Sequence, residues 1–137
     1  NTDNLKNIYD EAEIENTIFD FEENLADLIN QSDLCITRAG ASTLAELSIM
    51  NKPFLTIPLV SAKDNHQFEN ANFYQNLGCC WIMSQKDFND VNLEKFLDNI
   101  ITNKSEYDEK KNNLEKHNFQ NSWNDINQKI LETINEN

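Results

Sequence analysis

The fold is decided by the stretch Ser32–Ala71, which reads SDLCITRAGASTLAELSIMNKPFLTIPLVSAKDNHQFENA. It contains two short apolar runs, Leu34–Thr37 and Phe54–Pro58, which are typical of buried parallel strands. Apolar residues at helical spacing follow each run, first in Thr43–Met50 and then in His66–Leu77. An alternation of strands and helices favours a parallel sheet that is covered by its connecting helices.

The flanking residues continue this order of elements. Thr17–Phe21 is a short β-prone segment, and Glu22–Gln31 has the apolar spacing of a helix. Gly78 is a suitable end for the helix before it, and Cys79–Met83 predicts a fourth strand. The predicted fold is therefore α/β, a Rossmann-like parallel sheet with helices on both faces. It ends in a helical C-terminal tail, with helices expected at Val91–Ile101, Glu106–His117 and Trp123–Ile134.

Length and composition indicate one soluble domain. The chain has 137 residues, 39% of them hydrophobic, and a formal net charge of −13. So acidic a domain repels phosphate backbones and anionic lipids, which disfavours nucleic-acid binding and membrane contact. No apolar run approaches the roughly 20 residues that span a bilayer. The three cysteines show no C-x-x-C spacing, which argues against a zinc site or a disulfide framework and favours a reducing compartment.

A small-residue loop after the first strand is the leading candidate for a ligand site. Ligands of open α/β sheets bind at the carboxyl ends of the strands, where Arg38–Ser42 is expected to lie. The following helix start offers free N–H groups and a partial positive charge, which suit a phosphate or pyrophosphate. Gly40 and Ala41 let the backbone approach a ligand closely, and Ser42 or Thr43 is expected to cap the helix.

Two charged residues flank this loop, and each has a structural alternative. Glu46 could complete a capping box with Ser42 or Thr43, or its carboxylate could bind the vicinal hydroxyls of a sugar. Local spacing favours the first role. Arg38 by itself is more typical of a surface residue or a salt-bridge partner than of a ligand contact.

The loop after the second strand should open on the same edge of the sheet. Its residues Asp64–Gln67 form a polar cluster at a helix start, where local geometry favours N-capping by Asp64 or Asn65. His66 has no nucleophile at a recognisable spacing. Neither His66 nor His117 belongs to a metal-binding pattern, so no metal or other cofactor is predicted.

The segments TRAGASTLAEL and KPFLTIPLVSAKDNHQFENA closely resemble the C-terminal domain of the MurG family. These enzymes are the undecaprenyl-pyrophosphoryl-muramoylpentapeptide N-acetylglucosaminyltransferases of peptidoglycan synthesis. The resemblance implies the GT-B architecture, in which two Rossmann-like domains enclose the substrate cleft and the C-terminal domain holds UDP-N-acetylglucosamine. Residues 1–137 would then be a partial C-terminal nucleotide-sugar-binding domain.

The resemblance also implies roles for individual residues. Gly40–Leu44 would face the pyrophosphate through backbone N–H groups, and Glu46 would bind the ribose hydroxyls, against the local preference for capping. His66 and Gln67 would lie near the donor sugar, where many relatives have two glutamines, so His66 departs mildly from the pattern. The implied UDP-N-acetylglucosamine contacts are Arg38, Gly40, Ala41, Ser42, Thr43, Leu44, Ala45, Glu46, His66 and Gln67.

Parts of the family pattern are missing from this sequence. The chain has two glycines, so it holds no glycine-rich acceptor loop, and the early part of the family's C-terminal domain is absent too. Together with the first residue, Asn1, this suggests a fragment that is inactive alone and has no catalytic residue of its own. The complete inverting transferase would act on the cytoplasmic face of the inner membrane, its lipid-linked acceptor held by the missing N-terminal domain.

Two other functions fit the same residues. The small subunit of the dolichol-linked N-acetylglucosaminyltransferase also has an A-G-A loop and a D-N-H-Q motif, although the form R-A-G-A-S-T-x-A-E favours the bacterial enzyme. A non-catalytic α/β module that binds a nucleotide or a protein would keep the fold and use Glu46 and Gln67 only as caps.

Overall fold

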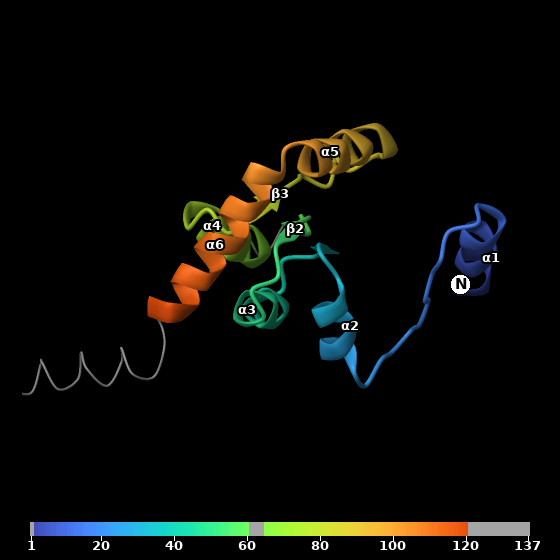
Figure 1. The fold of residues 1–137 in the computed structure, drawn as a ribbon, viewed down its shortest axis with the longest axis horizontal. Helices are drawn as coiled ribbons and strands as arrows, with labels where there is room; N and C mark the ends of the chain where they lie inside the picture. Colours follow the sequence, from blue (N-terminus) through green and yellow to red (C-terminus); the bar gives the residue numbers. More distant parts are fainter. Residues whose placement is uncertain (1, 61–64, 121–137) are drawn as a thin grey trace, which may run out of the picture.

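The computed structural model describes residues 2–60 and 65–120. Within these ranges the chain forms a parallel sheet of three strands in the order β1-β2-β3, surrounded by helices (Figure 1). The predicted helix Trp123–Ile134 lies outside the described residues. In chain order the elements are α1 (Thr2–Glu11), α2 (Leu25–Gln31), β1 (Cys35–Thr37), α3 (Ala41–Ile49), β2 (Phe54–Thr56), α4 (His66–Asn76), β3 (Cys80–Ile82), α5 (Asp90–Thr102) and α6 (Lys104–Gln120).

One face of the sheet carries the hydrophobic core. Phe54 of β2 is fully buried and aligned in register with Cys35 of β1 and Cys80 of β3. Its ring meets Tyr74 of α4 edge to face, with ring centroids 5.6 Å apart. Helices α3 and α4 contact each other, and α6 packs beside α3. The buried cluster consists of Ile29, Ala39, Leu44, Leu47, Phe54, Ala71, Cys79, Cys80 and Leu114.

The opposite face is covered through Trp81 of β3. Leu55 of β2 is in register with Trp81 and is 1% exposed. The Trp81 ring meets Phe96 of α5 edge to face at 5.4 Å between centroids, and its indole N–H donates to the carboxylate of Glu106 at 2.7 Å. The predicted arrangement, a parallel sheet with helices on both faces, is therefore confirmed.

The turn between α4 and β3 ends the helix as the sequence predicts. Gly78 has a φ of +70°, which residues other than glycine adopt only with strain. Its N–H donates to the carbonyl of Gln75 at 2.8 Å, and the N–H of Cys79 donates to the carbonyl of Tyr74 at 2.9 Å. These two bonds make a Schellman motif, which satisfies carbonyls at the end of α4.

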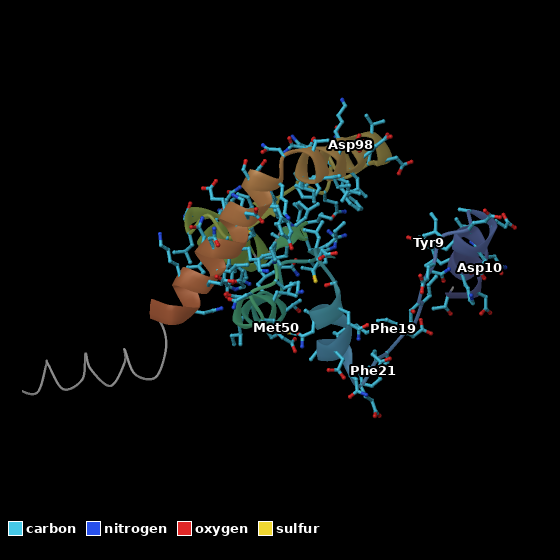
Figure 2. All side chains as sticks on the ribbon, in the orientation of Figure 1. Tyr9, Asp10, Phe19, Phe21, Met50 and Asp98 are labelled. Atoms are coloured by element: carbon cyan, nitrogen blue, oxygen red, sulfur yellow. The ribbon has the colours of Figure 1, made fainter. Side chains whose placement is uncertain are left out.

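The N-terminal segment differs from the prediction. Thr17–Phe21 is not a strand, because it lies apart from the sheet and, among the described strands, β1 pairs with β2 alone. Figure 2 shows Phe19 and Phe21 on the extended segment between α1 and α2, and Phe21 is 80% exposed. Helix α1 precedes this segment and was not predicted from the sequence. None of the residues of α1 is buried.

Candidate functional site

The candidate site lies where β1 and β2 end at the same edge of the sheet. Thr37 and Thr56 are aligned as the last residues of the two parallel strands, and the N–H of Ile57 donates to the carbonyl of Thr37 at 2.8 Å. Both following loops therefore leave the sheet side by side. The first leads directly into α3 and the second into α4. This is the edge at which open α/β sheets bind their ligands.

Helix α3 begins at Ala41, two residues before the predicted start at Thr43. Gly40 is the N-cap, with φ −66° and ψ 133°, and no side chain caps the helix in the described structure. The expectation that Ser42 or Thr43 caps α3 was therefore wrong. The first helical N–H groups have no intrahelical acceptor, and those of Ala41, Ser42 and Thr43 donate to none of the described residues at the positive end of the helix.

Leu44 and Ala45 differ from the residues before them. The N–H of Leu44 already donates to the carbonyl of Gly40 at 3.0 Å, and its side chain is fully buried. Leu44 thus anchors α3 in the core. The prediction that its N–H faces the pyrophosphate was wrong, because this N–H is already bonded within the chain. Ala45 is half-buried and lines a pocket of about 350 Å³ with Ser48 and Tyr74, among other residues.

Glu46 lies one turn further along α3, and its side chain is exposed. A capping box requires the acidic residue at the third helical position, which Thr43 occupies. The capping role that local spacing favoured is therefore excluded. Residues three and four positions apart share one helix face, so the carboxylate lies on the same side of α3 as Ser42 and Thr43. An exposed carboxylate beside free N–H groups suits a ligand with both hydroxyls and an anion.

Gln67 joins the two loops. Its side-chain oxygen accepts hydrogen bonds from the N–H of Ala39, at 3.3 Å, and from the N–H of Leu59, at 2.9 Å. The amide nitrogen of Gln67 donates no hydrogen bond to the residues that the structure describes. The same side chain therefore ties the two loops together.

The rest of the second loop was predicted less well. Asn65 is the N-cap of α4, but its side chain makes no capping bond in the described structure, so its predicted role was wrong. Asp64, the other predicted cap, lies outside the described residues. His66 is the first residue of α4 and is exposed, which places it at the same edge as Gln67.

Arg38 is exposed, as expected of a surface residue, and it forms no salt bridge with the residues that the structure describes. Its guanidinium donates to the carbonyl of Ile57 at 3.2 Å and to the side-chain oxygen of Gln85 at 3.1 Å. Arg38 thus links the ends of β1 and β2 to the segment after β3. It also lines a pocket of about 250 Å³ with Ile57 and Phe88, among other residues.

Sequence reasoning missed a third side chain at this loop, that of Asn70. Its amide nitrogen donates to the carbonyl of Ala39 at 3.0 Å. The signal was present in the spacing, because Gln67 and Asn70 are three residues apart and share one face of α4.

Within residues 2–60 and 65–120, no three His, Cys, Asp or Glu side chains gather in a way that could hold a metal ion. None of the described helices combines the length and apolar character that crossing a membrane requires. What the site offers chemically is therefore a set of N–H donors at a helix start, a carboxylate and a glutamine amide.

Comparison with known proteins gives a family match and close relatives. Residues 1–129 match the glycosyltransferase family 28 C-terminal domain. The chain is 50% identical over 137 residues to a Pelagibacter ubique (strain HTCC1062) protein, covering 100% of this chain and 38% of that protein. It is 39% identical over 99 residues to a Rickettsia bellii (strain RML369-C) protein, covering 72% of this chain and 28% of the relative.

Both relatives carry the name UDP-N-acetylglucosamine--N-acetylmuramyl-(pentapeptide) pyrophosphoryl-undecaprenol N-acetylglucosamine transferase. A Campylobacter jejuni subsp. jejuni serotype O:23/36 (strain 81-176) protein of the same name is 42% identical over 96 residues, 70% of this chain and 27% of the relative. The chain thus spans about 38% of the length of the Pelagibacter relative and less of the other two. These matches confirm the resemblance noted in the two sequence motifs.

Proposed function

Because the chain belongs to the glycosyltransferase family 28 C-terminal domain family, we propose that it is the donor-binding part of an N-acetylglucosaminyltransferase of peptidoglycan synthesis. The complete enzyme transfers N-acetylglucosamine from UDP-N-acetylglucosamine to a lipid-linked muramoyl-pentapeptide. The observation that carries this proposal is the uncapped start of α3 at the carboxyl edge of the sheet, with Glu46 exposed one turn away. The chain would hold part of the donor site, and residues 1–137 would be part of a GT-B C-terminal domain.

Each group of the proposed site has a chemical task. The N–H groups of Gly40, Ala41, Ser42 and Thr43 bind the diphosphate, helped by the positive end of α3. Glu46 accepts hydrogen bonds from the ribose hydroxyls, since a carboxylate matches a vicinal diol. Gln67 donates from its side-chain amide to the sugar, and His66 is its neighbour at the start of α4. Arg38 acts indirectly, by holding the loop that it begins.

The proposed reaction is an inverting transfer. The acceptor hydroxyl attacks the anomeric carbon of the donor sugar, the bond from this carbon to the diphosphate oxygen breaks, and UDP leaves. Preorganised N–H groups stabilise the negative charge that develops on the departing diphosphate. The base that takes the acceptor proton, and the acceptor site, would belong to the remainder of the enzyme. That enzyme would work at the cytoplasmic face of the membrane that holds its lipid-linked acceptor.

Calorimetric titration of the 137-residue chain with UDP-N-acetylglucosamine tests this proposal, with Glu46→Ala as the main variant. We expect the variant to bind at least about tenfold more weakly, because a charged hydrogen bond to the ribose is lost. Its free energy of unfolding should change by less than about 0.5 kcal/mol, because the Glu46 carboxylate is exposed and caps nothing.

Glu94→Ala is the matched control, since Glu94 is also an exposed helical glutamate but lies on α5. It should leave both the affinity and the stability unchanged. A folded wild-type chain that binds no nucleotide sugar would contradict the proposal and support a non-catalytic module. Equal loss of affinity in Glu94→Ala and Glu46→Ala would contradict a specific contact between Glu46 and the ribose.

A further inference from the structure

The loop that precedes α3 is held by helix α4 rather than by the sheet. Strand β1 ends at Thr37, and Ala39 lies beyond the ladder of the sheet. Ala39 is fully buried, and both of its backbone polar groups bond to side chains of α4. Its N–H donates to Gln67 at 3.3 Å, and its carbonyl accepts from Asn70 at 3.0 Å.

These two bonds set the orientation of successive peptide planes. The carbonyl of Ala39 and the N–H of Gly40 belong to one planar trans peptide unit, so they point in opposite directions. Asn70 fixes the carbonyl, and it thereby fixes the direction of the Gly40 N–H. The preceding peptide plane is held likewise, because the Thr37 hydroxyl donates to the carbonyl of Arg38 at 3.1 Å.

The N–H of Gly40 has no acceptor among the described residues, although the peptide that carries it is anchored. It stands next to the N–H groups of Ala41 and Ser42 at the uncapped start of α3. Consecutive N–H groups that are oriented in advance and left without partners are the arrangement that binds phosphate oxygens. Asn70 itself bonds to the carbonyl of Ala39, which points away from the Gly40 N–H.

We propose that Asn70 is a positioning residue, which orients the Gly40 N–H and the start of α3 for the diphosphate of the nucleotide sugar. This inference rests on the proposed function and adds a residue that makes no contact with the ligand. Gln67 shares the task, but it also bonds to Leu59 and has a proposed sugar contact. Asn70 therefore offers the cleaner test.

The test compares Asn70→Ala with two other variants of the same chain. Asn70→Gln keeps an amide donor, so it should retain part of the affinity that Asn70→Ala loses. Asn72→Ala is the matched control, because Asn72 is a half-buried asparagine of α4 whose side chain bonds to none of the described residues. The melting temperature of each variant is measured first, so that affinities are compared for the folded protein.

The first measurement is calorimetric titration with UDP. Asn70→Ala should bind about tenfold more weakly than the wild type, Asn70→Gln should fall between them, and Asn72→Ala should match the wild type. A purely structural role would lower the melting temperature of Asn70→Ala and leave the affinity of the folded fraction unchanged, and that result would overturn the inference.

The second measurement needs no ligand and separates the two proposals. In a nitrogen–proton correlation spectrum, the Gly40 amide resonance should shift in Asn70→Ala and stay in place in Asn72→Ala. An unshifted Gly40 resonance would overturn the positioning role whatever the chain binds. A wild-type chain that binds no UDP would instead overturn the proposed function, and the resonance would then decide only whether Asn70 orients the loop.

Discussion

The two glycines of this chain sit in turns that look alike and have different explanations. Gly40 precedes α3, and Gly78 follows α4. An asparagine from a neighbouring helix holds each turn, since Asn70 donates to the carbonyl of Ala39 at 3.0 Å and Asn113 to the carbonyl of Gly78 at 3.1 Å.

The difference lies in what a side chain would meet. At Gly78 the φ is +70°, and an added Cβ would lie 2.6 Å from the amide nitrogen of Asn113. At Gly40 the φ is −66°, and an added Cβ would lie 3.6 Å from the hydroxyl oxygen of Thr43, an ordinary contact. The fold therefore requires glycine at 78 but not at 40, and a ligand that approaches the backbone is the explanation we favour for Gly40.

The largest effect on stability is expected from Gly78→Ala. An alanine there would adopt a left-handed conformation and crowd Asn113, which should lower the free energy of unfolding by about 1–3 kcal/mol. Urea unfolding followed by circular dichroism measures this change. The folded fraction should bind UDP as the wild type does, and a variant as stable as the wild type would remove the contrast between the two turns.

Gly40→Ala should show the opposite pattern. The free energy of unfolding should change by less than about 1 kcal/mol, because the backbone and the surroundings accept a methyl group. The affinity for UDP should nevertheless fall about tenfold, since the methyl group occupies space that the diphosphate needs. Calorimetric titration measures the affinity, and unchanged binding would show that the ligand does not approach the loop here.

The smallest effect near neutral pH concerns the thiols that follow Gly78. Burial raises the pKa of Cys80 to about 12, from an ordinary value of 9.0, and raises the pKa of Cys79 as well. Below about pH 9 both thiols are protonated in the folded and unfolded states and add no pH dependence. Above it the unfolded chain ionises first, so the free energy of unfolding should fall as the pH rises from about 9 to about 12.

Denaturant unfolding at several pH values between 8 and 11 checks this decline, with Cys80→Ala as the comparison. The variant should lose less stability over that range than the wild type. Parallel curves for the two proteins would mean that the Cys80 thiol ionises equally well in both states, which would contradict its burial beside the second turn.

The sheet itself could be read from local patterns. The runs around Leu55 and Trp81 are apolar because β2 and β3 pack against neighbours on both faces, and the run around Ile36 has the same character although Ile36 is 42% exposed. The prediction failed at Thr17–Phe21, where β propensity was read without a partner strand. Propensity describes how a residue suits a sheet, whereas backbone bonding to a neighbour decides whether a strand exists.

The candidate site was readable to a smaller extent. Gly40 and Gln67 were found because they belong to recognisable motifs, and Glu46 was assigned two roles that spacing could not separate. The structure removed one role by starting α3 at Ala41, which puts Glu46 outside any capping box. Asn70 was missed because its partner, the carbonyl of Ala39, is 31 residues away in the sequence.

By itself, the sequence determined the alternation of strands and helices, the positions of the two glycines and the motifs that mark the family. Hydrophobic periodicity and turn chemistry depend on residues that are close in sequence, so the sequence alone reveals them. Only the tertiary structure decided which N–H groups at the start of α3 remain free and which side chains hold the loop before it. Those outcomes depend on how closely α4 approaches the loop that follows β1, because a hydrogen bond forms only when two distant segments come within about 3 Å of each other.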